Sequence, residues 1–394
     1  MKSELKIAII GGGPSGMMSA IALARKGVEV ALIEKSSWPI DKVCGEGIMP
    51  SGVEILKEFG VFELIDSKFY RKFVGINYID CLGKGKARGE FQSGTGYVVR
   101  RTALSQALYK KACEYPSISL HPFTEFINFK LDDSKITVYV RDDSSGSEQS
   151  IENFDYIIGC DGIRSRVRKI ANMDSSPPSD KKRIGARAHF KMAPWSDCVD
   201  VWWNKGIECY VAPVSEEIVE FVFGWDHDVV KPQGKGKSSG LESGLFSFFP
   251  ELEKKVEGVE KLSPLRSYGP LPTGSKGPIQ GQVILVGDSC LFFDPITGEG
   301  LSLSFEQSKL LAENIFSLGH ASGVQSYISK IVNIKTNYLR VTSLALVFTY
   351  FPWVRRVALW ILSFCPSIFN HMLEVNMGRR KIWQFSRSRL LKTQ

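Results

Sequence analysis

KIAIIGGGPSGMMSAIALARKGVEVALIEK, residues 6–35, is the stretch of the chain that decides the fold. The apolar run Ile7–Ile10 is short and ends at glycine, which predicts a fully buried parallel strand. Glycines then follow at the spacing G-x-G-x-x-G. In this spacing the first glycine permits a tight turn, the second lets backbone approach a pyrophosphate, and the third lets a helix pack on the strand. The three glycines are Gly11, Gly13 and Gly16.

The residues after this loop complete the pattern. Residues 17–25 are rich in helix formers, and the start of such a helix offers free N–H groups and a positive dipole end to phosphate. A second strand over residues 28–33 ends in Glu34, which lies 23 residues after Gly11. An acidic side chain at this distance can accept hydrogen bonds from an adenosine ribose. Strand, loop, helix, strand and acid in this order predict a dinucleotide-binding unit.

Composition limits the class of protein. The chain has 394 residues, of which 43 % are hydrophobic and 23 % charged, as expected of a globular protein with two domains. Its eight cysteines include no C-x-x-C pair, so we predict neither a metal site nor a disulfide framework. A net charge of +8 is modest, and we expect no nucleic-acid partner. Met1–Leu5 is too short and polar for a signal peptide, which predicts a cytoplasmic protein.

The rest of the chain divides into segments. Residues 36–50 contain glycines and prolines that predict a loop on the ligand side of the sheet. Four successive strand-like runs between residues 183 and 225 predict an inserted antiparallel sheet. The predicted class is α/β, a Rossmann-type βαβ domain with an inserted antiparallel-sheet substrate domain and C-terminal helices. The boundaries are 1–72, 97–182 and 276–330 for the dinucleotide domain, 73–96 and 183–275 for the substrate domain, and 331–394 for the C-terminal helices.

Two later segments echo the first one, and the three together resemble a known family. GCDGIRSRVR covers residues 159–168, and GDSCLFFDPITGEGL covers residues 287–301. With the N-terminal motif they resemble the FAD-dependent hydroxylases related to p-hydroxybenzoate hydroxylase, whose relatives include flavin halogenases and geranylgeranyl reductases. The resemblance extends over residues 5–330. It implies FAD as the cofactor and NAD(P)H as a transient co-substrate, because no second dinucleotide motif follows a strand in this sequence.

The resemblance also implies roles for individual residues. The N-terminal glycines and Ser15 would hold the pyrophosphate, Glu34 and Lys35 the adenosine end, and Asp288 the ribityl hydroxyls. Backbone N–H groups at the start of a helix near residue 300 would face the flavin, where charge builds on reduction. The remaining residues implied in cofactor binding are Arg101, Asp161, Gly162, Gly298, Gly300 and Leu301. For Asp161 and Gly162 the alternative is a plain junction between strand and turn. Arg164, Arg166 and Arg168 either attract nicotinamide phosphates or form a solvated basic face.

The reaction is expected to be hydroxylation. A hydroxylase of this family brings reduced flavin and O2 together as a C4a-hydroperoxide beside a hydrophobic aromatic or polyketide-like substrate. We expect the inserted sheet to wall the pocket, with about half of its aromatics facing away because side chains alternate along a strand. Candidate substrate contacts are Trp203, Tyr210, Pro213, Phe223 and Pro295. A halogenase is not expected, because the Trp-x-Trp-x-Ile-Pro segment of flavin halogenases is missing.

Two further functions remain open at this stage. Cys44-Gly45-Glu46-Gly47 resembles geranylgeranyl reductases, in which hydride passes to an alkene without oxygen, whereas Tyr210-Val-Ala-Pro213 matches them only in part. A flavin-binding protein without turnover is the other alternative. Catalytic candidates are Cys44, Glu46 and His189. Cys44 is either functional or a small residue chosen for space, and His189 is either a base or a structural histidine.

The C-terminal segment suggests a hydrophobic environment. Residues 341–354 and 357–364 are apolar, but each run is shorter than the roughly 20 residues of a bilayer span. Arg355, Arg356 and Pro352 interrupt them, and no acid follows Glu374 in a tail that carries six lysines and arginines. These helices either attach to an anionic membrane surface or pack over the substrate pocket.

Overall fold

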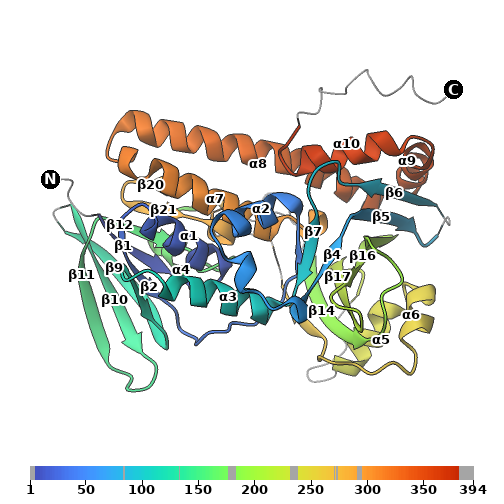
Figure 1. Cartoon of the computed structure of the whole chain (residues 1–394), viewed down its shortest axis with the longest axis horizontal. Helices are drawn as coiled ribbons and strands as arrows, with labels where there is room; N and C mark the ends of the chain where they lie inside the picture. Colours follow the sequence, from blue (N-terminus) through green and yellow to red (C-terminus); the bar gives the residue numbers. More distant parts are fainter. Residues whose placement is uncertain are drawn as a thin grey trace.

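The computed structural model describes residues 5–82, 85–132, 134–175, 183–230, 238–269, 271, 274–290 and 295–380. Two large sheets organise this part of the chain. Figure 1 shows the first sheet with its helices at the left and centre, and the second sheet at the right. The predicted α/β class with an inserted antiparallel sheet is confirmed.

The first sheet contains the dinucleotide unit. β1 pairs in parallel with β2 on one side and with β12 on the other, and every core residue from Ile7 to Ile10 is buried. In spatial order its strands are β20 (Ile279–Gln280), β21 (Val283–Leu285), β12 (Tyr156–Gly159), β1 (Lys6–Ile10), β2 (Glu29–Ile33) and β8 (Ile118–His121). The helices that contact one another beside it are α1 (Pro14–Ala24), α3 (Arg101–Cys113), α2 (Pro50–Glu58) and α7 (Gly300–Asn314). The carboxyl ends of β1, β2, β12 and β21 share one edge, where open parallel sheets bind ligands.

The second sheet is built from segments that lie far apart in the sequence. Its strands are β18 (Arg266–Tyr268), β14 (Arg183–Lys191), β17 (Ile218–Asp226), β16 (Ile207–Pro213), β15 (Val199–Asn204), β5 (Gly75–Asp80) and β6 (Lys86–Glu90). The pairs β14–β17, β17–β16 and β16–β15 are antiparallel, as predicted, whereas β15 pairs with β5 in parallel.

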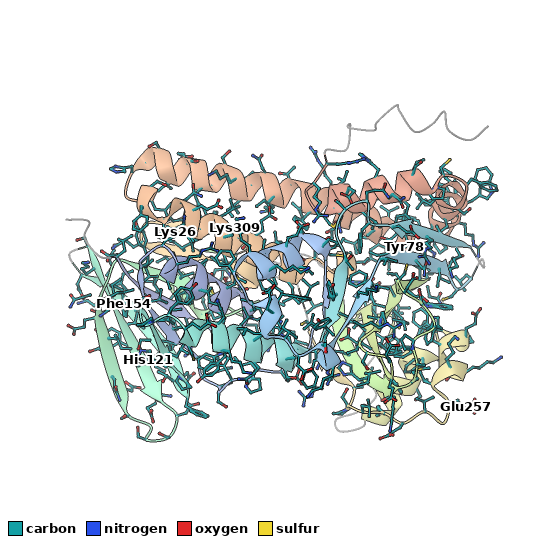
Figure 2. All side chains as sticks on the ribbon, in the orientation of Figure 1. Lys26, Tyr78, His121, Phe154, Glu257 and Lys309 are labelled. Atoms are coloured by element: carbon teal, nitrogen blue, oxygen red, sulfur yellow. The ribbon has the colours of Figure 1, made fainter. Side chains whose placement is uncertain are left out.

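The two faces of the second sheet carry different cores. One face packs Phe221, Phe223 and Trp225 against α5 (Ser238–Phe246) and α6 (Pro250–Val256). The other face meets the C-terminal helices, where Tyr78 of β5 contacts Trp203, Phe348 and Phe369. Figure 2 labels Tyr78 at this junction. Because successive side chains of a strand point to opposite faces, neighbouring residues belong to different cores.

The smaller elements complete the two layers. β9 (Thr124–Asp132), β10 (Lys135–Asp142) and β11 (Glu148–Phe154) form a three-stranded sheet at the left of Figure 1. Two further small sheets pair β3 (Gly47–Ile48), β7 (Gly96–Val99) and β4 (Tyr70–Phe73), and β13 (Asp174–Ser175) with β19 (Gly274–Ser275). The short helix α4 (Arg166–Ile170) follows β12, and the 3-10 turns η3 (Gly287–Ser289) and η4 (Pro295–Thr297) precede α7.

Three helices end the described chain. α8 (Ala321–Tyr350) runs along the top of the molecule in Figure 1, and α9 (Pro352–Phe364) and α10 (Pro366–Asn376) follow at its right end. Among the described helices, none is by itself long and apolar enough to cross a membrane. By length and composition α8 and α9 together pass that test, but the pair is bent by 116°.

Candidate active site

In the glycine loop after β1, some glycines are required by the packing of the protein and another borders open space. Gly11 has a φ of +103°, and a Cβ there would lie 2.5 Å from the carbonyl oxygen of Cys160. A Cβ on Gly16 would overlap the carbonyl oxygen of Gly11. Gly13, in contrast, has a φ of −69° and would meet no atom within 4 Å. Gly11 and Gly16 therefore allow close packing of the loop, whereas Gly13 leaves open space in front of the N-terminus of α1.

The end of β2 lies beside this loop. Glu34 Oε2 accepts a hydrogen bond from the backbone N–H of Gly12 at 2.7 Å, and Oε1 accepts one from Ser36 at 2.9 Å. Trp38 Nε1 donates to the carbonyl oxygen of Gly12 at 2.9 Å, which the sequence did not reveal. Lys35 is exposed at the same edge. The predicted ribose ligand and the predicted pyrophosphate loop are thus in direct contact.

Asp161 takes the junction role that the sequence left open. Its Oδ2 accepts hydrogen bonds from the backbone N–H groups of Arg166 at 2.7 Å and Val167 at 3.1 Å, at the start of α4. Burial raises the pKa of this carboxyl group. Its Oδ1 is buried without a partner among the described residues, and Gly162 follows with a φ of +80°. One oxygen therefore caps α4, and the other is left for a further hydrogen bond.

The arginines of the middle motif differ in exposure: Arg164 and Arg166 are exposed, as in the solvated face that the sequence left open, whereas Arg168 is buried. Arg164 donates to the carbonyl oxygen of Gly269 at 3.0 Å, and Arg166 to that of Phe126 at 2.6 Å. Arg168 is buried and binds the carbonyl oxygens of Ser289 at 2.9 Å and Ile163 at 2.7 Å. Arg168 thus ties the turn after β12 to the turn after β21. Neither sequence alternative describes it.

The third motif brings a second helix N-terminus to the same edge. Gly287 has a φ of +70° and lies against Ser15, and Asp288 Oδ2 is 3.4 Å from Lys42 Nζ. Cβ atoms on Gly298 or Gly300 would meet nothing within 4 Å. Leu301, half-buried, begins the first turn of α7.

A tie from the C-terminal layer supports this turn. The side-chain amide of Asn376, the last residue of α10, donates to Oε1 of Glu299 at 2.8 Å. Glu299 is buried, its Oε2 has no partner among the described residues, and burial raises its pKa well above the ordinary value.

Arg101 provides the test of whether a cofactor fits. Its side chain is 4 % exposed, yet Nε and Nη1 have no partner among the described residues. A buried guanidinium without acceptors costs several kcal/mol, roughly as an unpaired buried charge does. Together with the open space at Gly13, Gly298 and Gly300, it fits a dinucleotide whose oxygen atoms supply the missing acceptors. We therefore retain Arg101 as a predicted ligand of FAD.

A buried charged cluster lies where the loop of residues 36–50 meets the second sheet. Glu46 Oε1 accepts from the backbone N–H of Arg101 at 2.8 Å and from Arg187 Nη1 at 3.2 Å, and Oε2 is 3.0 Å from His189 Nε2. Arg187 Nη2 also donates to Asp41 Oδ1 at 2.9 Å. Glu220 Oε2 accepts from the backbone N–H of Glu46 at 3.1 Å, and Oε1 has no hydrogen-bond partner among the described residues.

The protonation states of this cluster follow from burial and neighbours. Burial raises the pKa of Glu220 well above its ordinary value, and the nearby charge of Glu46 acts in the same direction. The pKa of Glu46 is lowered, because hydrogen bonds and nearby cations outweigh its burial. The pKa of His189 is lowered by burial. We assign a neutral His189 that donates from Nε2 to Glu46 and accepts at Nδ1 from Ser263 Oγ, 3.0 Å away.

These contacts argue against two functions for the cluster, a metal site and a catalytic base. Glu46, His189 and Glu220 place ligand atoms within 4.8 Å of one another, which could hold a metal ion. Arg187 already brings positive charge to the same carboxylate at 3.2 Å, so we assign the cluster to hydrogen bonding. His189 is fully buried and both of its ring nitrogens are engaged. The alternative of a structural histidine therefore applies, rather than a base that meets substrate.

Two members of this cluster, Arg187 and Glu220, were not predicted from the sequence, although strand alternation could have indicated them. Arg187 and His189 are two residues apart on β14, and Glu220 pairs directly with His189 across the ladder to β17. All three therefore lie on one face of the sheet. Charged residues at alternate positions of otherwise apolar strands were the available signal.

The substrate candidates divide between the two faces. Phe223 is fully buried on the far face against Phe246 and Phe249, which corrects the expectation that it walls a pocket. Trp203 is fully buried beneath α8 against Phe348, so it too is a core residue. Pro213, also buried, lines a shallow recess beside Trp195. Tyr210 reaches the turn η4, where its hydroxyl donates to the carbonyl oxygen of Ile296 at 2.6 Å. The side chain of Pro295 lies outside the described residues.

Cys44 differs from the other two catalytic candidates. Glu46 and His189 are buried, whereas Cys44 is only partly buried in the loop between the two sheets. Its surroundings include Arg101 and Lys42 on the side of the first sheet, and Arg187 and Glu220 on the side of the second. Burial of the thiol outweighs the nearby cations and raises its pKa, so Cys44 stays protonated at neutral pH.

The fold and the site define a flavin-dependent oxidoreductase of the Rossmann type. The chain belongs to the FAD binding domain family, whose sequence model matches residues 4–238. This confirms the resemblance and supports FAD as the cofactor.

Individual relatives are distant from this chain. Conditioned medium factor receptor 1 of Dictyostelium discoideum is 26 % identical over 336 residues, which are 78 % of this chain and 62 % of that protein. Digeranylgeranylglycerophospholipid reductase of Methanosarcina acetivorans is 27 % identical over 79 % of this chain and 75 % of its own length. For 6-hydroxynicotinate 3-monooxygenase of Bordetella bronchiseptica, the identity is 23 % over 83 % of this chain and 88 % of that enzyme.

Solved structures share the fold. The flavin-dependent brominase Bmp2 superposes with a TM-score of 0.82 at 18 % identity, covering 95 % of this chain and 94 % of the brominase. The p-nitrophenol 4-monooxygenase PnpA from Pseudomonas putida gives a TM-score of 0.79 at 17 % identity, covering 97 % of this chain and all of the enzyme.

Proposed function

We propose that the chain is an FAD-dependent, NAD(P)H-consuming reductase of carbon–carbon double bonds in a hydrophobic, isoprenoid-like substrate. One observation carries this choice over oxygen insertion. Of the three catalytic candidates, Cys44 alone has exposed surface, and its thiol remains protonated. Saturation of a double bond needs one hydride and one proton, so a neutral thiol between the cofactor side and the substrate side supplies what the reaction requires.

The residues divide the work as follows. Bound FAD would supply the hydride that NAD(P)H delivers to it. Arg101 and the N-termini of α1 and α7 would hold its charged and carbonyl oxygen atoms. Cys44 holds a proton at Sγ for the second carbon of the double bond, and solvent replaces this proton because the side chain is not fully buried. In balance, NAD(P)H, one proton and the alkene give NAD(P)+ and the alkane.

The names of relatives favour the same reaction class. The name digeranylgeranylglycerophospholipid reductase describes reduction of an isoprenoid lipid. The Cys44–Gly47 loop of this chain resembles geranylgeranyl reductases. The second candidate is NAD(P)H-dependent monooxygenation of a hydrophobic aromatic or polyketide-like substrate. The similarity to 6-hydroxynicotinate 3-monooxygenase favours it, and it would use the same cofactor site with O2.

The test is turnover of the FAD-loaded enzyme with and without oxygen. The holoenzyme is incubated under nitrogen with geranylgeranyl diphosphate and either NADPH or NADH. The masses of the products are then measured by mass spectrometry. We expect products that gain two hydrogen atoms per reduced bond. Products formed only in air and carrying an oxygen atom from 18O2 would replace the reductase by the monooxygenase. A yellow protein that yields neither product would be a flavin binder without turnover.

A thiol variant makes the test specific. We expect Cys44→Ser to lower alkene reduction by about 100-fold, the size of a general-acid contribution, because a serine hydroxyl is a far weaker acid. Reduction of bound flavin by NAD(P)H, followed by loss of its absorbance, should be unchanged. Cys113→Ser, which alters an exposed thiol on α3, is the matched control. Full reductase activity in Cys44→Ser would remove Cys44 from the mechanism.

A further inference from the structure

Helix α9 turns a stripe of large apolar side chains toward solvent. Trp353 is 70 % exposed, Trp360 64 % and Phe364 71 %, and Val357 and Ile361 between them are exposed as well. At 100° per residue, these five side chains fall within about a third of the helix circumference. The rings of Trp360 and Phe364 contact each other edge to face, with 5.1 Å between their centroids. An exposed apolar patch of this kind marks an interaction surface.

The opposite side of α9 fixes the direction of the stripe. Leu359 and Leu362 are buried in the core beneath the helix. Arg355 is fully buried, with Nε 2.8 Å from Asp80 Oδ1 and Nη1 2.7 Å from the carbonyl oxygen of Phe348. Turning the apolar stripe inward would expose these leucines and break a buried ion pair, leaving Asp80 without its buried partner. The stripe therefore faces outward as a stable feature of the fold.

Positive charge lies beside the stripe. Asp80 is shared between Arg355 and Arg356, so this group of three residues has a net charge of +1. Arg356 is half-exposed on the flank of the stripe. Lys205 is exposed on the neighbouring turn, where the Asn204 carbonyl oxygen is 3.5 Å from Arg355 Nη1. In the sequence, residues 375–394 contain six lysines and arginines and no acid.

We propose that α9 docks this protein on the surface of a membrane that contains anionic phospholipid, with the helix lying in the plane of the interface. Tryptophan is enriched at this depth of a bilayer because its ring is apolar while its N–H remains hydrogen-bonded. Apolar burial and attraction of basic residues to anionic lipid add to each other in such helices. The charge beside the stripe favours lipid over a second copy of the chain, which would bring the same positive charge to the contact. The proposal does not depend on which reaction the enzyme catalyses.

The test is flotation of the full-length, FAD-loaded protein with vesicles. We expect binding to vesicles of phosphatidylcholine with about 30 % phosphatidylglycerol and weaker binding to phosphatidylcholine alone. High salt should lower binding to the anionic vesicles to the level of phosphatidylcholine alone, because the charges are screened. Trp353→Ser, Trp360→Ser and Phe364→Ser together should lower the partition coefficient by more than about tenfold, since three buried rings are removed from lipid. The flavin spectrum of this variant should not change.

A second variant distinguishes this surface from general hydrophobicity. Leu131 and Leu262 are exposed apolar residues elsewhere on the molecule, and their change to serine should leave vesicle binding as in the wild type. Wild-type protein that does not float with anionic vesicles would overturn the proposal. So would equal binding by the triple variant. A dimer on size exclusion that the triple variant abolishes, without vesicle binding, would assign the stripe to a second copy instead.

Discussion

Glu220 is a carboxyl group held where a negative charge is costly. It is 1 % exposed, its Oε1 has no hydrogen-bond partner in the part of the chain that the structure describes, and Glu46 lies next to it. Its pKa is therefore raised well above the ordinary value, although Arg187 acts in the opposite direction. Two buried carboxyl groups beside each other avoid ionising together, so one keeps a proton. Here Glu46, which receives hydrogen bonds from Arg101 and Arg187, is the ionised partner.

This assignment makes stability depend on pH. Because the raised pKa lets folded protein bind more protons than unfolded protein, wild-type stability falls as pH rises from the ordinary glutamate value toward the raised one. The loss is about 1.4 kcal/mol per pH unit in that window. In Glu220→Gln, whose amide mimics the protonated acid, this loss disappears. Urea unfolding at pH 5 and pH 8 measures it. A variant that gains no stability over wild type at pH 8 would contradict a protonated Glu220.

Sequence reasoning reached some residues of the site and not others. The predicted ligands Gly13 and Glu34 follow from a local pattern, and the structure places both at one loop. Arg187 and Glu220 lie on β14 and β17, which are far apart in the sequence and pair in the sheet, so their meeting with Glu46 required knowledge of the sheet register. The predicted position of Phe223 was wrong for the same reason. A shift of one residue in strand register moves a side chain to the opposite face of the sheet.

At the scale of elements, the glycine loop separates folding from ligand binding. Gly16 lets α1 approach the loop, while Gly13 borders open space at the N-terminus of α1. A close approach between backbone and pyrophosphate requires this space only when the cofactor is bound.

Two alanine variants test this separation. We expect Gly13→Ala to change the free energy of unfolding of the apoprotein by less than about 0.5 kcal/mol, because its backbone conformation suits alanine. Its affinity for FAD should fall by roughly tenfold or more, because the new methyl group occupies the space of the pyrophosphate. Gly16→Ala should destabilise the apoprotein by about 1–3 kcal/mol through overpacking. Urea unfolding and fluorescence titration with FAD distinguish the two. Equal FAD affinity in Gly13→Ala and wild type would show that no ligand enters there.

Helices were more predictable than sheet partners. The helix expected from the helix formers of residues 17–25 corresponds to α1, because its pattern is local. The parallel pairing of β5 with β15 joins segments more than a hundred residues apart, and no local pattern indicates it. The direction of α9 also escaped prediction. An apolar helix is ambiguous between core and surface until the ion pair between Arg355 and Asp80 fixes which side is buried.

At the scale of the whole molecule, the cofactor site joins parts of the chain that are otherwise separate. The glycine loop, the loop of residues 36–50 and the turn before α7 come from distant segments, and Lys42 and Asp288 connect two of them. A ligand that binds such a place stabilises the folded state, since unfolding scatters its contacts.

FAD should therefore act as a structural ligand. At a free concentration 100-fold above its Kd, FAD adds about 2.7 kcal/mol to the free energy of unfolding. Thermal unfolding of protein stripped of flavin should occur at lower temperature and recover on addition of FAD. Riboflavin, which lacks the pyrophosphate and adenosine, should restore much less. Equal recovery with riboflavin would mean that the glycine loop contributes little to binding.

The hydrogen bond from Asn376 to Glu299 has a practical consequence for handling this protein. The last residue of the final described helix braces the turn that we predict to face the flavin, so the carboxyl-terminal region is not a dispensable appendage. Shortening the chain ahead of α10 to improve solubility would remove that brace, and the product should emerge from purification pale instead of yellow.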